Sequence, residues 1–176
     1  MNTGQMLITI GAIFLLSLVI LRVNATLLTT NNVLDRSKIG LLSVSMATSL
    51  IEEATSKSFD ENTIAGSVSS TNQLSAVLKA ETGEVYPAFD DIDDFNAFRT
   101  TPKIDTVYIS SSAYIVFQTF CAVDYVSDAN PEQVSNQRTW NKRLTVKVTS
   151  PAMIDENTAK QDTILLKTVY SYWYFR

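Results

Sequence analysis

The strongest pattern in the chain is an apolar run close to its start. No residue from Met6 to Leu21 carries a charge, and only Thr9, Gly11 and Ser17 interrupt the apolar side chains. As a helix this run would be ~24 Å long, close to the ~30 Å hydrocarbon core of a bilayer. The run therefore predicts a helix that inserts into a membrane.

Two alternatives account for the same run. A cleaved signal peptide would end near Val23-Asn24-Ala25, where small residues resemble a cleavage site. Against it, residues 1–5 contain no Lys or Arg, and the helical pattern continues past the proposed cut. The second alternative is a buried helix of a soluble protein, but a helix that is apolar on all sides is hard to bury in a domain of this size.

Downstream of Arg22 the pattern becomes that of an amphipathic helix. Apolar side chains recur in steps of seven and four, while polar side chains occupy the other faces. The apolar stripe consists of Leu27, Leu34, Leu41, Leu42, Met46, Leu50 and Ala54. Because no Pro occurs before Pro87, we expect one helix over 5–58, ~80 Å long and weakest at Thr29–Asn32.

The two halves of this helix need different partners. The amphipathic half can pack its apolar stripe on the rest of the chain. The first half, once outside lipid, can be buried only against copies of itself. This requirement predicts a polymer with a core of bundled helices at 6–21. Its core residues would be Met6, Leu7, Ile8, Ile10, Ile13, Phe14, Leu15, Leu18, Val19, Ile20, Leu21 and Arg22.

The second half of the sequence has the pattern of β-strands. The run 114–125 is rich in aromatic and β-branched residues, and 162–175 reads as a long terminal strand. Between them, Leu144, Val146 and Val148 alternate with polar residues, as in a half-buried strand. The fold class we expect is therefore α+β.

These strands would form a globular head of residues 59–176. A short helix over 73–78, capped by Ser70 and its neighbours, would precede the sheet. Pro131 and Pro151 would lie in connections, because Pro interrupts a strand ladder. We expect an antiparallel meander of three or four strands with the long helix packed on one face.

The composition narrows the range of functions. The 176 residues include 14 Lys and Arg, 18 Asp and Glu, no His and one Cys, with a net charge of −4. Without a basic cluster, nucleic-acid binding is not expected. Without His, the commonest general base and zinc ligand are missing, and no Gly-rich phosphate loop is present. We expect neither enzymatic activity nor a cofactor.

Four carboxylates lie within five residues, at Asp90, Asp91, Asp93 and Asp94. Such charges repel one another unless they are solvated, lie at the start of a helix or bind a cation. Hard oxygen ligands suit calcium, although the spacing is not that of an EF-hand. The favoured interpretation is a solvated acidic turn at a helix start, and a calcium site is the alternative.

A Gly followed by an apolar run, an amphipathic continuation and a β-rich head together resemble the type IV pilins. That superfamily includes the pseudopilins of type II secretion. The resemblance covers residues 4–58 in detail and the remainder only in architecture. The acidic segment 90–95 also resembles a stretch of pilin-like proteins of the mannose-sensitive haemagglutinin type.

The resemblance implies processing after Gly4. A prepilin peptidase would remove residues 1–4 as a short leader and leave Gln5 as the first residue. The chain departs from the family because no Lys or Arg precedes Gly4, because Thr9 stands where a Glu is usual, and because the common mid-helix Pro is missing. Counted from an uncut Met1, the fifth residue is Gln5, a neutral isostere of Glu.

The resemblance also implies a function, as the structural subunit of an extracellular pilus-like filament. The subunit would lie in the inner membrane before assembly. Its partners would be identical subunits, an assembly ATPase, a membrane platform protein and a prepilin peptidase, and amino-terminal methylation and a role in cell adhesion would fit. The alternatives are a single-span, membrane-anchored exported binding module, or a minor pilin or secretion pseudopilin.

Three further residues or segments each allow two interpretations. Arg22 either marks the end of the apolar run or pairs with a carboxylate or carbonyls of a neighbouring copy. The aromatic segment 170–176 serves as core, as a contact surface between subunits, or both. Cys121, within an apolar strand, is expected to be a small buried hydrophobe, with a disulfide between copies as the alternative.

Overall fold

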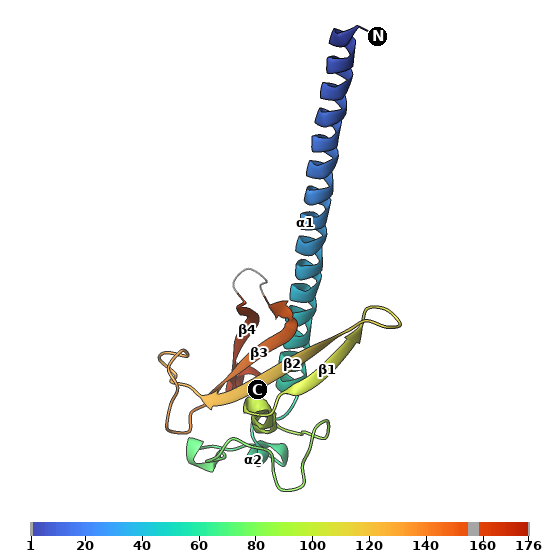
Figure 1. Cartoon of the computed structure of the whole chain (residues 1–176). Coiled ribbons are helices and arrows are strands. Elements are labelled where there is room, and N and C mark those ends of the chain that lie inside the picture. The colour runs from blue at the N-terminus through green and yellow to red at the C-terminus, as the bar shows by residue number, and fades with distance from the viewer. Residues whose placement is uncertain (1, 155–158, 176) are drawn as a thin grey trace. The chain divides into compact units, whose positions relative to one another are not determined.

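The computed structural model of the chain describes residues 2–154 and 159–175. Figure 1 shows the long helix α1 and a sheet of four strands, which confirms the expected α+β fold. In chain order the elements are α1 (Thr3–Thr55), α2 (Glu61–Ile64), η1 (Thr71–Gln73), η2 (Asp93–Arg99), β1 (Lys103–Tyr108), β2 (Tyr114–Tyr125), β3 (Asn141–Ile154), β4 (Gln161–Ser171) and η3 (Tyr172–Phe175), where η denotes a 3-10 helix.

Contacts within the chain define two compact units. The N-terminal unit extends through Ile39, and the C-terminal unit begins at Gly40. Helix α1 contributes residues to both units.

Helix α1 is 53 residues long and continuous, so the segment Thr29–Asn32 does not break it. It starts at Thr3 and ends at Thr55, slightly earlier at both ends than the predicted 5–58. Backbone hydrogen bonds just after Thr55 explain why the helix ends there. The N–H of Ser58 donates to the carbonyl of Asp90, and the carbonyl of Ser58 accepts from Ile92. This bridge takes the backbone out of the helix.

The four strands form an antiparallel meander in the order β1-β2-β3-β4, as expected. Cys121 of β2 lies opposite Val146 of β3, which lies opposite Leu166 of β4. Residues directly opposite one another in neighbouring strands lie on the same face of the sheet, and so does every second residue along one strand. Along β2 every second residue from Ile115 to Tyr125 is buried, which matches this alternation.

Within the C-terminal unit, residues 40–55 of α1 pack on the sheet. The buried positions are Ser43, Ala47, Leu50 and Ala54, spaced as on one face of a helix. Leu50 and Ala54 belong to the predicted stripe, but Leu41 is 73% exposed. Three of the four buried side chains are small, and small side chains allow a helix axis to approach a sheet closely.

Three local predictions are wrong. Only η1 forms near the predicted 73–78 helix; Ser70 caps it, and the backbone is extended at Leu74, whose side chain is buried. Pro151 lies inside β3, where the pairing with β4 shifts register and therefore tolerates a residue without an N–H. The last strand ends at Ser171, and the N–H of Tyr172 donates to the carbonyl of Trp140.

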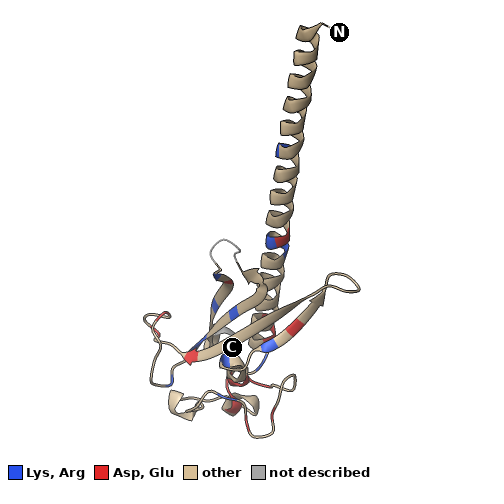
Figure 2. Cartoon of the chain, in the orientation of Figure 1, with Lys and Arg blue, Asp and Glu red and all other residues tan. Residues whose placement is uncertain are grey.

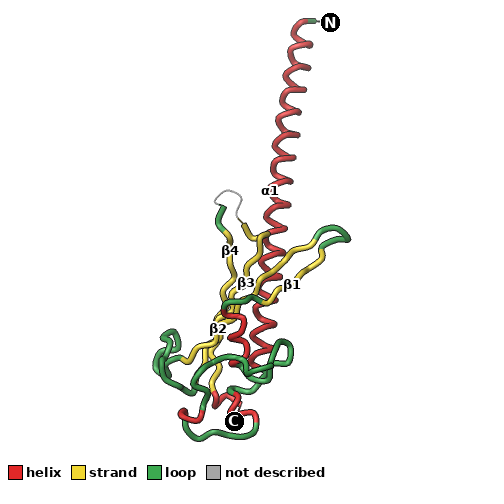
Figure 3. Tube along the Cα trace, turned by 60° about the horizontal axis from the view of Figure 1, so that its bottom comes forward, coloured by secondary structure: helices red, strands yellow, loops and turns green. Residues whose placement is uncertain are grey.

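The segment between α1 and β1 consists mainly of loops and short helices (Figure 3). Its helix η2 covers part of β2 that β1 does not reach, because β1 pairs only with Tyr114–Thr119. There the side chain of Asn96 accepts from the N–H of Val123, and Arg99 donates to the carbonyl of Val123. These two side chains satisfy backbone groups that would otherwise lie at an open edge.

Candidate functional site

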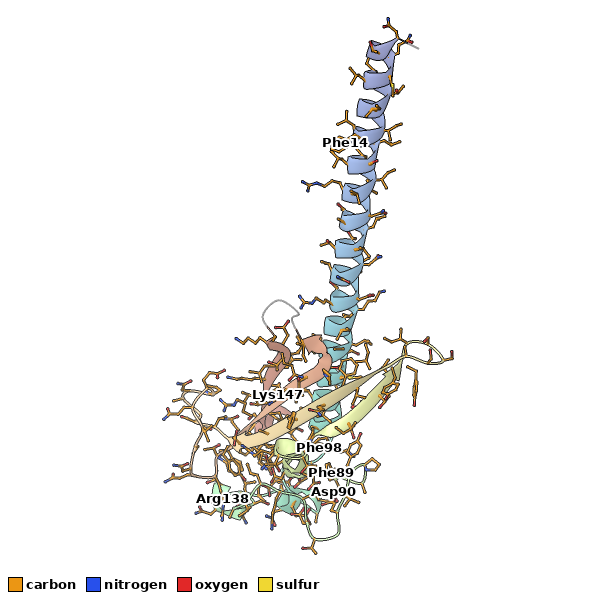
Figure 4. The ribbon with its side chains drawn as sticks, in the orientation of Figure 1. Phe14, Phe89, Asp90, Phe98, Arg138 and Lys147 are labelled. Atoms are coloured by element: carbon orange, nitrogen blue, oxygen red, sulfur yellow. The ribbon has the colours of Figure 1, made fainter. Side chains whose placement is uncertain are left out.

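The uncharged segment 6–21 of the N-terminal unit presents apolar side chains to its surroundings. Leu7, Ile13 and Phe14 are 70%, 65% and 63% exposed in the single chain. Figure 4 shows side chains projecting on both sides of this helical segment, with Phe14 labelled. The predicted core residues, Met6, Leu7, Ile8, Ile10, Ile13, Phe14, Leu15, Leu18, Val19, Ile20, Leu21 and Arg22, are all exposed.

The hydroxyl groups of this segment are satisfied within the helix itself. Thr9 donates to the carbonyls of Gln5 and Met6 at 3.1 and 2.8 Å, and Ser17 donates to that of Ile13 at 2.9 Å. Thr26, Thr29, Thr30 and Ser37 bond in the same way to the carbonyl four residues earlier. These polar residues therefore need no external partner in an apolar environment.

Residues 2–34 contain one charged side chain. Arg22 is the first charged residue of the sequence, and the next is Asp35. Figure 2 shows this as a long uncoloured stretch of α1. Among the described helices, α1 alone is long and apolar enough to cross a membrane.

At the predicted processing site, Gly4 and Gln5 both belong to α1. A Cβ added at Gly4 would meet no atom within 4 Å. The fold of the single chain therefore does not require Gly at this position, and the cleavage prediction stays untested.

A cluster of charged groups surrounds a buried lysine, Lys142, in the C-terminal unit. The Nζ of Lys142 lies 2.9 Å from Oδ2 of Asp60 and 2.6 Å from Oδ1 of Asp93, and it donates to the carbonyl of Phe59 at 2.7 Å. It also lies 4.4 Å from the ring centre of Phe59 and 5.2 Å from that of Tyr125. All three charged side chains are at most 2% exposed. A fully enclosed, paired ammonium group indicates a structural role.

Of the two carboxylates that pair with Lys142, Asp60 accepts more hydrogen bonds than Asp93. It caps α2 and accepts from the N–H and the hydroxyl of Ser75 and from the hydroxyl of Tyr125. Burial alone would raise the pKa of Asp60, but Lys142 and the Ser75 donors outweigh burial and lower it below its ordinary value. Asp60 is therefore ionised in the folded protein.

The other buried carboxylates are less well compensated. Burial, followed by the charges of Asp93 and Asp94, raises the pKa of Asp91 to about 8. Burial also raises the pKa of Asp93 to about 7, although Lys142 acts in the opposite direction. One oxygen of each of these two residues lacks a hydrogen-bond partner in the described structure. The region therefore holds more buried carboxyl groups than Lys142 alone can keep ionised near neutral pH.

The predicted solvated acidic turn is wrong for three of its four residues. Only Asp90 is exposed, whereas Asp91, Asp93 and Asp94 are at most 1% exposed. They do lie at a helix start, because Asp91 Oδ1 accepts the N–H groups of Asp93 and Asp94 at the beginning of η2. The position of these residues at a helix start could be predicted from the local sequence. Their burial could not, because it depends on distant parts of the chain.

The four Asp residues do not converge on one point. Asp93 faces Lys142 and Asp91 faces the backbone of η2, while Asp94 lies beside Glu81 and Glu84. One carboxylate oxygen from each of these last three residues lies within 4.8 Å of the other two. We call Glu81, Glu84 and Asp94 the acidic triad. The prediction named only Asp94 among its members.

Aromatic packing brings the acidic triad together. Glu81 and Glu84 flank a turn in which the N–H of Glu84 donates to the carbonyl of Glu81 and Gly83 adopts φ +95°. Downstream of the turn, Phe89 packs edge-on against Phe95 of η2, with ring centres 5.3 Å apart. Figure 4 shows Phe89, Phe98 and Asp90 in this region. The contact holds the turn beside the start of η2, where Asp94 lies.

The triad is strongly acidic and has no cationic partner. Burial, then a bond to Glu84 and the charges of Asp94 and Glu61, raises the pKa of Glu81 to about 7. Within residues 2–154 and 159–175, no triad carboxylate forms an ion pair with Lys or Arg. Three adjacent oxygens without a counter-charge are suited to a hard cation.

The C-terminal aromatic segment is partly core. Tyr170 and Tyr172 are buried, and both rings pack on Phe59. Tyr172 also stacks on Trp140 at 5.0 Å and bonds to the backbone of Val68 through its hydroxyl. Trp173 is 54% exposed and is therefore accessible to a partner. The side chains at 174–176 lie outside those described.

Cys121 is buried, as predicted. Its position on β2 places it opposite Val146, in the interior of the C-terminal unit. Burial raises the pKa of the thiol to about 12, so the reactive thiolate is scarcely populated near neutral pH.

Comparison with protein-family models, with curated proteins and with solved structures found no match to this chain. A long helix with an apolar first half and a four-stranded antiparallel sheet are elements compatible with the pilin fold. The family expectation therefore stands on the sequence features and on this architecture.

Proposed function

We propose that the chain is the structural subunit of an extracellular filament of the type IV pilus kind. The observation that carries this proposal is the exposure of apolar side chains along the uncharged helical segment 6–21. Burial of apolar surface is worth roughly 25 cal/mol per Å², so this segment strongly favours an environment that covers it.

Lipid and a bundle of identical helices are the two environments that can provide this cover. The length and composition of α1 fit a membrane span, which supports residence in the inner membrane before assembly. After export of the C-terminal unit, association with the same segment of other copies would keep the apolar surface buried in a filament core.

The polar groups of the segment are compatible with both environments. Because its hydroxyls bond to carbonyls of the same helix, neither lipid nor a helical bundle leaves them unsatisfied. The charge of Arg22, next to the apolar run, requires either the interfacial region of a membrane or a carboxylate or carbonyls from another copy.

The second candidate is a single-span exported module that stays in the membrane and does not polymerise. The same observation on α1 supports it, because one membrane-spanning helix is sufficient to anchor a protein. A minor pilin or secretion pseudopilin would combine both properties. The two candidates differ in whether the helices of different copies are in contact.

The test begins with cells that express the full chain. Their surface filaments are removed by shear, and the supernatant is sedimented and imaged. We expect thin filaments of uniform diameter that contain this chain. Recovery of the chain solely from the membrane fraction, as a monomer in detergent, would support the anchored module and contradict the proposal.

A matched pair of variants makes the test specific. Phe14→Ala combined with Leu18→Ala keeps the segment apolar enough to insert but removes packing surface, so membrane insertion is expected with few or no filaments. Val77→Ala, at an exposed position of the C-terminal unit, should leave filament yield unchanged. Amino-terminal sequencing of the filaments distinguishes a mature start at Gln5 from an intact Met1.

A further inference from the structure

The acidic triad offers three oxygen ligands from two separate segments of the chain. Glu81 and Glu84 lie on one turn, and Asp94 lies in the first turn of η2. Two oxygens that bind the same ion at ~2.4 Å are at most ~4.8 Å apart, whereas the limit for magnesium is nearer ~4.2 Å. The triad oxygens all lie within 4.8 Å of one another, which is inside the limit for calcium.

Asp94 supplies an independent indication of a ligand. Its side chain is 0% exposed, and its Oδ2 accepts the N–H groups of Asp90 and Asp91 at 3.0 and 3.1 Å. Its Oδ1 is buried without any hydrogen-bond partner among the described residues. A buried carboxylate oxygen without a donor is costly unless a cation or a proton satisfies it.

The surrounding charge has the same sign. Glu61 and Asp90, both exposed, are the nearest acidic neighbours that act on the triad region. A bound divalent cation would reduce repulsion among these groups and would hold the Glu81–Glu84 turn against η2. From the buried unpartnered oxygen and the converging carboxylates we propose that Glu81, Glu84 and Asp94 bind a calcium ion, with water completing its coordination.

This proposal is independent of polymerisation. It concerns only the C-terminal unit, and a calcium site would exist equally in a filament subunit and in an anchored module. We expect a dissociation constant on the order of 10⁻⁴–10⁻³ M, the range of extracellular calcium modules.

The experiment uses the full chain in detergent micelles after treatment with a chelator. CaCl₂ is titrated in a calorimeter, and the melting temperature is recorded with and without calcium. We expect saturable heat with one ion per chain, a rise in melting temperature, and affinity for MgCl₂ at least tenfold weaker. Absence of saturable heat would overturn the proposal, because a shared proton would then satisfy the triad.

Variants separate ligation from a merely structural effect. Glu81→Gln and Glu84→Gln should each weaken calcium binding at least tenfold. Because they also remove repulsion, both should melt at or above the wild-type temperature when no calcium is present. Asp162→Asn, which changes an exposed carboxylate on β4, should bind calcium like the wild type. Equal calcium binding by all of these variants would contradict the assignment.

Discussion

The Nζ of Lys142 lies 2.6 Å from Oδ1 of Asp93, and both side chains are excluded from solvent. Lys142 comes from β3, whereas Asp93 begins η2, 49 residues earlier in the chain. The same Nζ binds Asp60 and the backbone carbonyl of Phe59. The ammonium group of Lys142 thus connects strand β3 with the segment just after α1 and with the start of η2.

Lys142→Met should destabilise the C-terminal unit by about 3–5 kcal/mol, because it leaves two carboxylates buried without their counter-charge. Denaturant unfolding of the full chain in detergent, followed by Trp fluorescence, measures the loss. Lys147→Met is the matched control, since Lys147 is exposed and contacts only the ring of Phe120 among the described interactions. It should cost less than ~1 kcal/mol. Similar losses in both variants would contradict the role given to Lys142.

Asp60 predicts a defined dependence of stability on pH. The pKa of Asp60 is lowered from 3.8 in the folded state, so the folded protein favours the ionised form more than the unfolded chain does. Its contribution is fully present above about pH 4 and is lost as the pH falls through the folded pKa.

Asp60→Asn should therefore reduce stability by about 1–3 kcal/mol at pH 6, and the difference from wild type should shrink below about pH 3. Melting curves between pH 2 and pH 6 test this expectation. Asp128→Asn, at an exposed position, should leave the curve of stability against pH unchanged. A constant difference between Asp60→Asn and wild type across the range would refute the assignment.

Cys121 should resist thiol reagents in the folded protein. The side chain is fully buried and its pKa is raised to about 12, so a maleimide should label it only in denaturant. Mass spectrometry of native and denatured samples gives the measurement. Rapid labelling of the native protein, or disulfide-linked dimers on a non-reducing gel, would show that the interior position of Cys121 is wrong.

The helix–sheet contact depends on a small side chain at position 47. Ala47→Leu introduces bulk where the helix faces the sheet and should destabilise the C-terminal unit by about 1–3 kcal/mol. Leu41→Ala, at a position 73% exposed, should change stability by less than ~0.5 kcal/mol. The reverse order of these two losses in denaturant unfolding would favour the stripe predicted from sequence.

The long helix and the strands could be predicted because their signals are local. An uncharged run without Pro indicates a helix, and the aromatic and β-branched run 114–125 and the alternation over 144–149 each indicate a strand. The buried face of α1 was only partly predictable. Ser43 and Ala47 carry no hydrophobic signal, yet their small size suits them to the contact with the sheet.

The acidic triad and the Lys142 cluster could not be derived from sequence in the same way. Asp94 is ten residues from Glu84, and the contact between Phe89 and Phe95 that joins their segments has no local signature. Acidic residues ordinarily lie at the surface, which is why the turn was expected to be solvated. Its burial depends on a lysine 49 residues away from Asp93.

The hydroxyl groups of α1 have a consequence for the reversibility of the proposed assembly. Thr9, Ser17 and Thr26 keep their hydrogen bonds inside their own helix. A helix that exchanges lipid for neighbouring copies, or returns from them, therefore breaks no bond of these groups in either direction. In the filament proposed above, the barrier to insertion and withdrawal would then be set by the fit of apolar surfaces and by the charge of Arg22 beside the apolar run.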